Sequence, residues 1–114
     1  MIRLVAIRDL KEGTSRGIEI DNKFLFAIKK DDLYHVYWNI CPHIGAPLEW
    51  QEDQFLDDDG EFIRCATHGA LFEIKSGKCA VGPCVGKKLH KIPFQIINDT
   101  ITVKESDLKS PSRF

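Results

Sequence analysis

Two short segments of similar composition place the strongest constraint on how this chain folds. The first is CPHIGAPL at residues 41–48, and the second is CATHGALF at residues 65–72. Each box supplies one cysteine and one histidine, and 21 residues separate His43 from Cys65. A glycine follows each histidine closely, at Gly45 and Gly69. Because glycine lets a loop turn sharply and brings backbone N–H groups near a bound group, both boxes have the composition of ligand-bearing loops.

Two cysteines and two histidines can hold either zinc or an iron–sulfur centre. Thiolates are soft ligands that suit both, and imidazole suits zinc and iron. A zinc site with two cysteines and two histidines is usually structural, with Cys–Cys and His–His pairs in sequence. Here each box mixes the two ligand types, which favours a dinuclear cluster with two cysteines on one iron and two histidines on the other. A zinc-binding structural or interaction module remains the alternative.

Length and charge limit the classes of protein to which the chain can belong. Its 114 residues are enough for one domain. Sixteen Lys and Arg against seventeen Asp and Glu give a net charge of −1, so no overall basic charge indicates nucleic acid or an anionic membrane as a partner. The apolar runs fall short of the roughly 18 residues of a membrane helix. The start, MIRLVAIRDLKEG, lacks a signal-peptide pattern. We expect a cytoplasmic protein.

Most of the remaining sequence has the pattern of β-strands. β-Branched and aromatic residues form short runs separated by turns rich in Asp, Asn and Gly. The expected strands are residues 2–7, 16–20, 24–30, 33–40, 61–65, 70–75, 78–81, 89–97 and 100–105. Turns at residues 21–23, Asp31-Asp32 and Asn98-Asp99 favour hairpins. Strands at intervals of about ten residues predict an all-β sandwich or barrel. The one helical candidate is residues 47–55.

The two boxes resemble the pair of cluster-binding boxes of Rieske 2Fe–2S proteins. The resemblance extends beyond the four ligands to Pro42, Leu48 and Phe72. Gly82-Pro83 resembles the proline-containing loop that covers the cluster in this family. The strand pattern is compatible from about residue 2 to about residue 105, so the resemblance covers nearly the whole chain.

The resemblance implies an all-β fold with two parts. A Rieske-like antiparallel sandwich or barrel forms the base, and a smaller cluster-binding subdomain is inserted into it. On this sequence the base would be about residues 1–40 and 87–106, and the subdomain about residues 41–86. Both belong to a single domain, residues 1–106, because the base strands come from both ends of the chain. We expect residues 107–114 to be a flexible tail and the protein to be a monomer.

The resemblance also implies a cofactor and a function. One Rieske-type 2Fe–2S cluster would have Cys41 and Cys65 on one iron and His43 and His68 on the other. Full coordination by four protein ligands leaves no open iron site, so we expect an electron carrier that is not a catalyst by itself. It resembles the small Rieske-type ferredoxins that pass one electron from a flavoprotein reductase to a terminal oxygenase.

A second family member with the same fold is the Rieske-type small subunit of assimilatory nitrite reductase. That lineage often lacks the cluster ligands, whereas all four are present here. Their presence favours the ferredoxin. Co-purification with a large enzyme subunit would favour the alternative.

Four positions around the boxes predict a low reduction potential. High-potential Rieske proteins of respiratory complexes add a cysteine in each box, joined as a disulfide, where this chain has Ala46 and Thr67. They also add a serine and a tyrosine whose hydroxyls bond to cluster sulfurs, where this chain has Ala70 and Phe72. Without these donors the reduced cluster is less stabilised. The potential should lie near the low end of the Rieske range of roughly −150 to +300 mV.

Other chemically distinctive residues have ordinary structural interpretations. Free cysteines are often buried, so we expect Cys79 and Cys84 to act as small buried apolar residues more readily than as a disulfide. His35 and His90 lie in expected strands and are interpreted as structural, and Trp38 as a packing residue.

The sequence gives less specific information about how the protein binds its partners. We expect a small, transient docking face around the box loops, including Ile44, Pro47 and Ala70. Residues 49–61 contain seven of the seventeen acids. A solvated loop is the first interpretation of this acidic stretch, and a surface that steers a basic partner is the second.

Overall fold

The computed structural model describes residues 1–40, 53–65, 69–82 and 86–108, and it confirms an all-β fold. The strands are β1 Ile2–Ala6, β2 Thr14–Ile20, β3 Lys23–Lys30, β4 Leu33–Trp38, β5 Phe62–Arg64, β6 Leu71–Glu73, β7 Cys79–Val81, β8 Gln95–Ile97 and β9 Thr100–Val103. Two short 3-10 helices accompany them, η1 Ile7–Asp9 and η2 Glu105–Leu108. Within the described ranges, no helix is long and apolar enough to cross a membrane.

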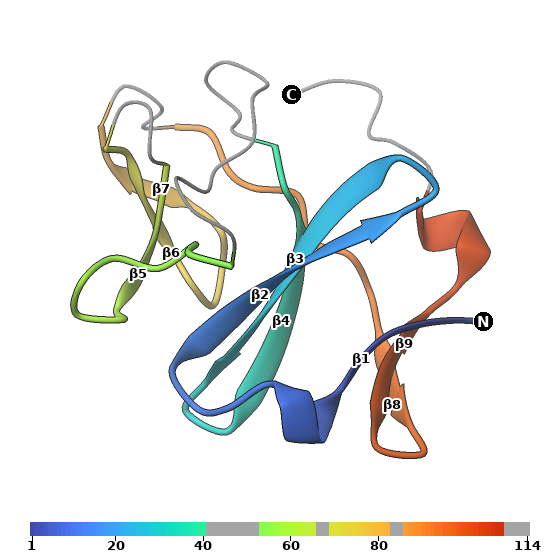
Figure 1. Ribbon diagram of the computed structural model, residues 1–114. Coiled ribbons are helices and arrows are strands. Elements are labelled where there is room, and N and C mark those ends of the chain that lie inside the picture. The colour runs from blue at the N-terminus through green and yellow to red at the C-terminus, as the bar shows by residue number, and fades with distance from the viewer. Residues whose placement is uncertain (41–52, 66–68, 83–85, 109–114) are drawn as a thin grey trace.

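The strands form three antiparallel sheets of three strands each (Figure 1). Sheet A has the order β1-β9-β8, sheet B has β2-β3-β4, and sheet C has β5-β6-β7. Sheet A joins the two ends of the chain, because β1 pairs along β9 from Ile2↔Val103 to Ala6↔Thr100. Sheet C is drawn entirely from the middle of the chain, between the first box and residue 82.

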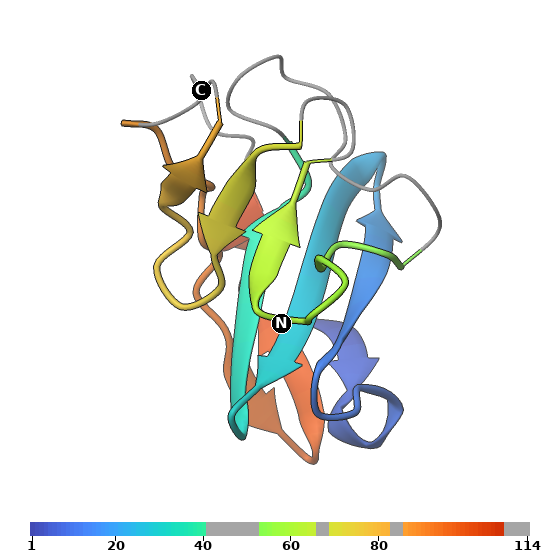
Figure 2. The ribbon, with the colours of Figure 1, turned by 90° about the vertical axis from the view of Figure 1, so that its left-hand side faces the viewer.

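Sheet B is the central layer, covered on both faces. Successive side chains of a strand point to opposite faces. In β3, Leu25 and Ala27 face sheet A, whereas Phe26 and Ile28 face sheet C, and all four are fully buried. The view turned by 90° shows sheet C in front of sheet B (Figure 2). The uninterrupted apolar run of β3 is therefore explained by burial on both faces.

Two hydrophobic cores lie on the two faces of sheet B. The base core, toward sheet A, contains Val5, Leu10, Leu25, Ala27, Val36, Trp38, Ile92, Ile101, Val103 and Leu108. The cluster-side core, toward sheet C, contains Phe26, Ile28, Tyr37, Phe55, Ile63, Cys65, Ala70, Phe72, Ile74, Cys79 and Leu89. The first core is mainly aliphatic, and the second contains four large aromatic side chains and the second-box cysteine.

The hairpin turns follow directly from Asp and Asn residues. Asp21-Asn22, Asp31-Asp32 and Asn98-Asp99 all have positive φ, between 50° and 63°. Two consecutive residues with positive φ match the type I′ turn, which fits the twist of the flanking strands. The Glu12 carboxylate also accepts hydrogen bonds from the backbone N–H groups of Asp32 and Asp31, and these bonds lower the pKa of Glu12.

Most strand ends differ from the sequence prediction by one or two residues, and three differences are larger or affect the core. Of the helical candidate 47–55, the structure describes residues 53–55, which are not helical, and Asp53 has a φ of 63°. The expected strand 89–97 is a strand only at residues 95–97, because Pro93 has no N–H to donate to a strand ladder. The fold continues past residue 106 to Leu108, which is buried in the base core. Residues 109–114 of the expected tail lie outside the described residues.

Candidate metal centre

The structure describes one of the four predicted ligands, Cys65. Cys41, His43 and His68 lie outside the described residues. The site is therefore built here from Cys65 and from the described ends of the loops that carry the other three.

The second box forms the tip of a hairpin. Cys65 follows β5 directly and Ala70 precedes β6 directly. The Cys65 N–H donates to the Ala70 carbonyl at 2.9 Å, and the Gly69 N–H donates to the Cys65 carbonyl at 2.8 Å. Gly69 has a φ of 66°, in the left-handed region that favours glycine. These bonds close the loop tightly and hold the Cys65 side chain in the cluster-side core, where it is fully buried.

Both flanks of the first box are attached to sheet B, one through β3 and the other through β2. Before the box, the Asn39 N–H donates to the Phe24 carbonyl of β3 at 2.9 Å. After the box, the Asp53 carboxylate accepts from the Gly17 N–H of β2 at 2.6 Å, and the Asp53 carbonyl accepts from the Ser15 hydroxyl at 2.7 Å. The two attachments fix where the loop carrying Cys41 and His43 begins and ends.

An aromatic stack joins sheet B to the site. The Phe26 ring stacks on Phe55 at 4.3 Å between centroids and on Tyr37 at 5.6 Å. The Tyr37 hydroxyl donates to the Ile74 carbonyl, beyond β6, at 2.5 Å. Burial raises the pKa of Tyr37, so this hydroxyl stays protonated and donating. Gly77 makes room for the ring, because a Cβ there would lie 2.9 Å from Tyr37 Cε1.

The segment after β7 begins directly against the second box. Gly82 has a φ of 111°, and a Cβ on it would lie 2.9 Å from Ala70 Cα. Only glycine fits so close to that backbone. Ala70 is consequently fully buried, so the prediction that it belongs to a docking face is wrong. The other two residues of that expected face, Ile44 and Pro47, lie outside the described residues.

Ala70 and Phe72 are the two described positions at which high-potential Rieske proteins have a hydroxyl, and neither side chain has one here. Ala70 and Phe72 are both fully buried in the cluster-side core. Phe72 pairs with Ile63 of β5 and with Cys79 of β7, so its ring is held between neighbouring strands. Ala46 and Thr67 lie outside the described residues.

Cys79 is buried, as expected, but it also takes part in a disulfide. Cys65, the other cysteine that the structure describes, is not part of it, so the second half-cystine lies outside the described residues. The burial of Cys79 agrees with its predicted packing role, while the disulfide is the less favoured of the two sequence interpretations. Cys84 lies outside the described residues.

The remaining histidines occupy structural positions. His35 is half-buried on β4, and its pKa is lowered by burial and by the nearby positive charges of Lys91 and Lys75. The His90 carbonyl accepts a hydrogen bond from the Trp38 N–H at 3.0 Å. Trp38 packs in the base core as predicted.

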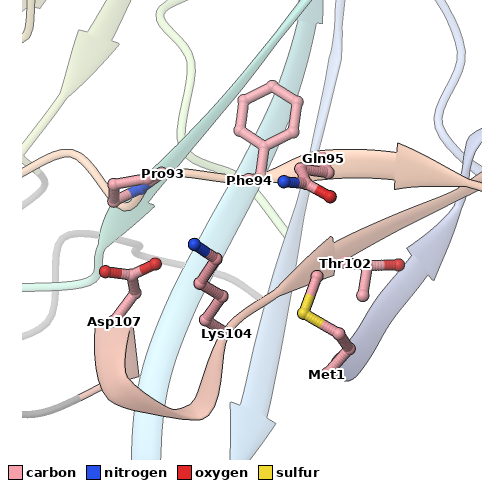
Figure 3. A pocket seen from close by; sticks show the side chains of 7 residues that line it. All are labelled: Met1, Pro93, Phe94, Gln95, Thr102, Lys104 and Asp107. Atoms are coloured by element: carbon pink, nitrogen blue, oxygen red, sulfur yellow. The ribbon is translucent and has the colours of Figure 1, made fainter.

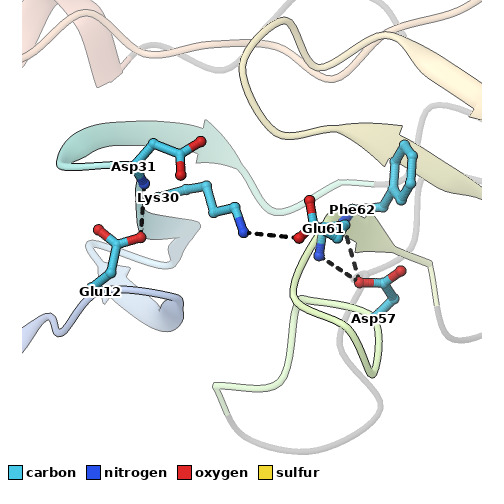
Figure 4. A network of polar contacts seen from close by, with 6 residues as sticks. All are labelled: Glu12, Lys30, Asp31, Asp57, Glu61 and Phe62. Carbon is cyan, nitrogen blue, oxygen red and sulfur yellow. Dashed lines mark hydrogen bonds and ion pairs between the residues drawn. The ribbon is translucent and has the colours of Figure 1, made fainter.

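The described part of the acidic stretch, residues 53–61, contacts the chain's own amides and cations (Figure 4). The Asp57 carboxylate accepts from the N–H groups of Glu61 and of the following residue, at 2.9 Å and 3.1 Å. The Glu61 carboxylate pairs with Lys30 at 3.3 Å. The Asp58 carboxylate forms an ion pair with the Arg64 guanidinium, with 3.9 Å between the nitrogen and the oxygen. These contacts favour the interpretation of a solvated loop whose acids stabilise its own turns.

A pocket on sheet A is a poor candidate for the metal centre (Figure 3). It is lined by Met1, Pro93, Phe94, Gln95, Thr102, Lys104 and Asp107. None of these is a cysteine or histidine, and sheet A lies across sheet B from the Cys65 hairpin.

The donor set and its surroundings fit an iron–sulfur cluster. Cys65 offers a buried thiol at the tip of a closed hairpin, and thiolates are the ligands on which such clusters depend. Gly82 packs against the same hairpin, because a Cβ on it would lie 2.9 Å from Ala70 Cα. Two thiols and two imidazoles, one of each in each box, complete a set of the Rieske type.

Comparisons with known proteins agree with this donor set. The model of the Rieske [2Fe-2S] domain matches residues 1–105. Apoptosis-inducing factor 3 of Mus musculus is 30% identical over 100 residues, which are 88% of this chain but only 16% of that relative. The ferredoxin component of the naphthalene 1,2-dioxygenase system of Pseudomonas putida is 28% identical over 97 residues, covering 85% of this chain and 88% of the relative.

A solved structure shows the same fold. It is the complex of reduced oxygenase and oxidized ferredoxin in carbazole 1,9a-dioxygenase, one chain of which matches with a TM-score of 0.72 and 23% identity over 90% of each chain. Proteins of this family carry a Rieske-type 2Fe–2S cluster. The match over residues 1–105, the paired boxes and the all-β fold together show that this chain belongs to the Rieske 2Fe–2S domain family.

Proposed function

We propose that the protein is a one-electron carrier whose 2Fe–2S cluster is held by Cys41 and Cys65 on one iron and by His43 and His68 on the other. The observation that carries the proposal is the pair of mixed boxes in a chain of this family, with the Cys65 thiol buried at a closed hairpin tip. When bound, such a cluster supplies reversible exchange of one electron.

The chain's own residues position the ligands and set the environment of the site. The hydrogen bonds between Cys65, Gly69 and Ala70 keep the second-box loop closed. Gly82 packs against Ala70, which is fully buried. Because Ala70 and Phe72 offer no hydroxyl, the reduced state receives no hydrogen bond from these positions. A carrier of low potential results, suited to electrons from a nicotinamide-dependent flavoprotein.

The proposed partners are a flavoprotein reductase, which donates the electron, and a terminal oxygenase, which accepts it. Two similarities support this: one relative is a ferredoxin component of a naphthalene dioxygenase system, and one similar chain belongs to an oxygenase–ferredoxin complex. The proposal includes a single domain over residues 1–106, with residues 41–86 as its cluster-binding part, that works as a monomer.

We also propose the cytoplasm as the working compartment. A reducing compartment opposes a disulfide such as the one at Cys79. Counting thiols in protein isolated anaerobically tests the compartment, because a cytoplasmic carrier should contain Cys79 in its reduced form. A Cys79 disulfide that is fully formed under these conditions would contradict this part of the proposal.

The ligand set is tested by histidine replacement. We expect the reduced protein to give a Rieske-type electron paramagnetic resonance signal, and the double variant His43→Ala, His68→Ala to lose it, because one iron then lacks both protein ligands. The matched control is His35→Ala, His90→Ala, which removes two histidines outside the boxes and should keep the signal.

Two results would contradict the assignment. An unchanged signal in the His43→Ala, His68→Ala variant would show that other residues bind the iron. A colourless protein that contains zinc after anaerobic expression would favour the structural zinc module.

A further inference from the structure

The segment that ends at Gly82 and the segment that begins at Gly86 run antiparallel, and both are rich in lysines. The Cys79 N–H donates to the Lys87 carbonyl at 3.0 Å, and the Leu89 N–H donates to the Gly77 carbonyl at 2.8 Å. Lys78 pairs with Lys88 in an isolated antiparallel bridge. The Lys91 ammonium donates to the Lys75 carbonyl. We call the exposed lysines of these segments the lysine ladder; they are Lys75, Lys78, Lys87, Lys88 and Lys91.

The lysine ladder lies in a stretch of sequence without acidic residues, although Glu73 immediately precedes this stretch and its N–H donates to the Lys78 carbonyl at 2.9 Å. Residues 74–98 contain five lysines and no Asp or Glu, in a chain that is close to neutral overall. The side-by-side placement of Lys78 and Lys88 is unfavourable, because like charges directly opposite each other destabilise a strand pair. Among the described residues, the ion pairs are Lys30–Glu61 and Arg64–Asp58, and neither includes a residue of this bridge.

The positive charge also acts on a neighbouring residue. His35 is half-buried on β4, and the charges of Lys91 and Lys75 add to burial in lowering its pKa. Lys91 and Lys75 therefore lie near enough to His35 for their charges to act on it.

An exposed apolar surface lies beside the ladder. Val81, at the end of β7, is 54% exposed, and Ala80 and Gly82 next to it are exposed as well. Gly82 in turn contacts Ala70 of the second box. An apolar centre with a charged rim is the usual composition of a protein docking surface, and this one adjoins the metal centre.

The acidic stretch differs from the ladder in how its charges are used. Asp57, Glu61 and Asp58 contact the chain's own amides and cations, and Asp53 holds β2. Lys78 and Lys88 are instead held together by the backbone while their charges repel. An external anionic partner would relieve the repulsion between these two lysines.

We propose that the lysine ladder, together with the exposed Val81 beside it, is a docking surface for the acidic face of a redox partner protein. The inference rests on the proposed carrier function and specifies the partner: one of the two electron-transfer proteins docks beside Gly82 through carboxylates. The contact would be small and transient, below about 1,200 Å². Its formation would weaken as salt screens the charges.

The experiment uses the holoprotein and two haem proteins of opposite charge as probes, acidic cytochrome b5 and basic cytochrome c. Affinity is measured by calorimetry, and electron transfer is measured separately by stopped flow. The variant Lys78→Gln, Lys88→Gln should bind cytochrome b5 roughly tenfold more weakly at low ionic strength. Its affinity for cytochrome c should be unchanged or higher. The difference for cytochrome b5 should shrink at high ionic strength.

A matched control removes the same charge elsewhere. Lys11→Gln, Lys104→Gln neutralises two exposed lysines of the base, away from sheet C, and should change the affinity for cytochrome b5 by less than about twofold. Equal losses in both double variants would overturn the proposal, because net charge alone would then explain binding. It would also be overturned if the ladder variant lost affinity only for anionic vesicles or duplex DNA.

Failure of the docking surface and failure of the carrier function give different results. An intact paramagnetic signal with unchanged binding of cytochrome b5 overturns the docking surface alone. Absence of the signal from wild-type protein overturns the carrier function, whereas the affinity comparison between the two variants still decides whether the surface binds acidic proteins.

Discussion

The two faces of sheet B bury similar amounts of chain but by different means. Toward sheet A, the base core is built mainly from aliphatic side chains. Toward sheet C, Phe26 stacks between Phe55 and Tyr37, and the Tyr37 hydroxyl bonds to the Ile74 carbonyl. Aliphatic packing tolerates exchange of one side chain for another of similar volume. Stacked rings and a hydrogen bond fix orientation as well as distance.

This difference suggests a division of roles within one strand. Leu25 and Phe26 are neighbours in β3 and both are fully buried, yet they belong to different cores. The base core holds the two ends of the chain together. The cluster-side core holds the hairpin that carries Cys65. Mutations on the two faces should therefore separate stability from the state of the metal centre.

The largest effect is expected for truncation of the two neighbouring residues of β3. Leu25→Ala should lower the free energy of unfolding by about 2–5 kcal/mol, and Phe26→Ala by about 3–5 kcal/mol. Only Phe26→Ala should also alter the paramagnetic signal, because only Phe26 packs against the Cys65 side of the sheet. Urea unfolding and spectroscopy on the same samples measure both effects.

If one of the alanine variants does not fold, a pair of more conservative substitutions makes the same comparison. Phe26→Leu removes the stack and Leu25→Val keeps an aliphatic side chain, so the spectroscopic contrast should remain. Equal spectral changes in both members of a pair would remove the proposed division between the two faces.

The next effect concerns the hydrogen bond between the sheets. Tyr37→Phe leaves the buried Ile74 carbonyl without its donor and should cost about 1–3 kcal/mol of unfolding free energy. Tyr34→Phe is the matched control on the same strand, because the Tyr34 ring contacts Lys29 through its face and would keep that contact. Its cost should be below about 0.5 kcal/mol. A Tyr37→Phe variant as stable as wild type would show that the bond is not a link between the sheets.

The smallest effect is a change in midpoint potential. Ala70→Ser and Phe72→Tyr restore hydroxyls that high-potential relatives possess. Each should raise the potential by about 60 mV or less, since about 1.4 kcal/mol favouring the reduced state equals 59 mV for one electron. Phe94→Tyr adds a hydroxyl near sheet A and should leave the potential unchanged.

Voltammetry of wild type and the three variants gives the comparison directly. A wild-type midpoint above about +100 mV would mean that other donors replace the missing hydroxyls. No rise in either hydroxyl variant would contradict the hydrogen-bond explanation for the low potential.

Local chemistry made most of the fold predictable. Alternating apolar residues marked the strands, and paired Asp and Asn residues marked the I′ turns at Asp31-Asp32 and Asn98-Asp99. The attachment of Asp53 to Gly17 was not predictable, because it joins residues 36 positions apart in the sequence. Because the sequence does not reveal this attachment, Pro47 predicts the start of a helix over residues 47–55. Residues 53–55 instead make hydrogen bonds to β2.

The site was predictable in its ligands and less so in its surroundings. The boxes identified Cys65 as a candidate ligand and Gly82-Pro83 as part of a covering loop, but the sequence did not indicate that Gly82 packs directly on Ala70. The lysine ladder did have a sequence signal, the absence of acids from residues 74–98. The overall charge of −1 concealed it, because net charge averages the acidic stretch and the ladder to nearly zero.

The attachment of the two boxes to different sheets has a consequence for the order of events during biosynthesis. The first box depends on sheet B through Asp53, and the second on sheet C, which Tyr37 joins to sheet B through a contact spanning 37 residues. A chain still emerging or unfolded presents its thiols far apart, so the four proposed ligands would come together only after both sheets have docked. Loading of iron would then act as a checkpoint, because only molecules that have completed the slow long-range pairing can retain it.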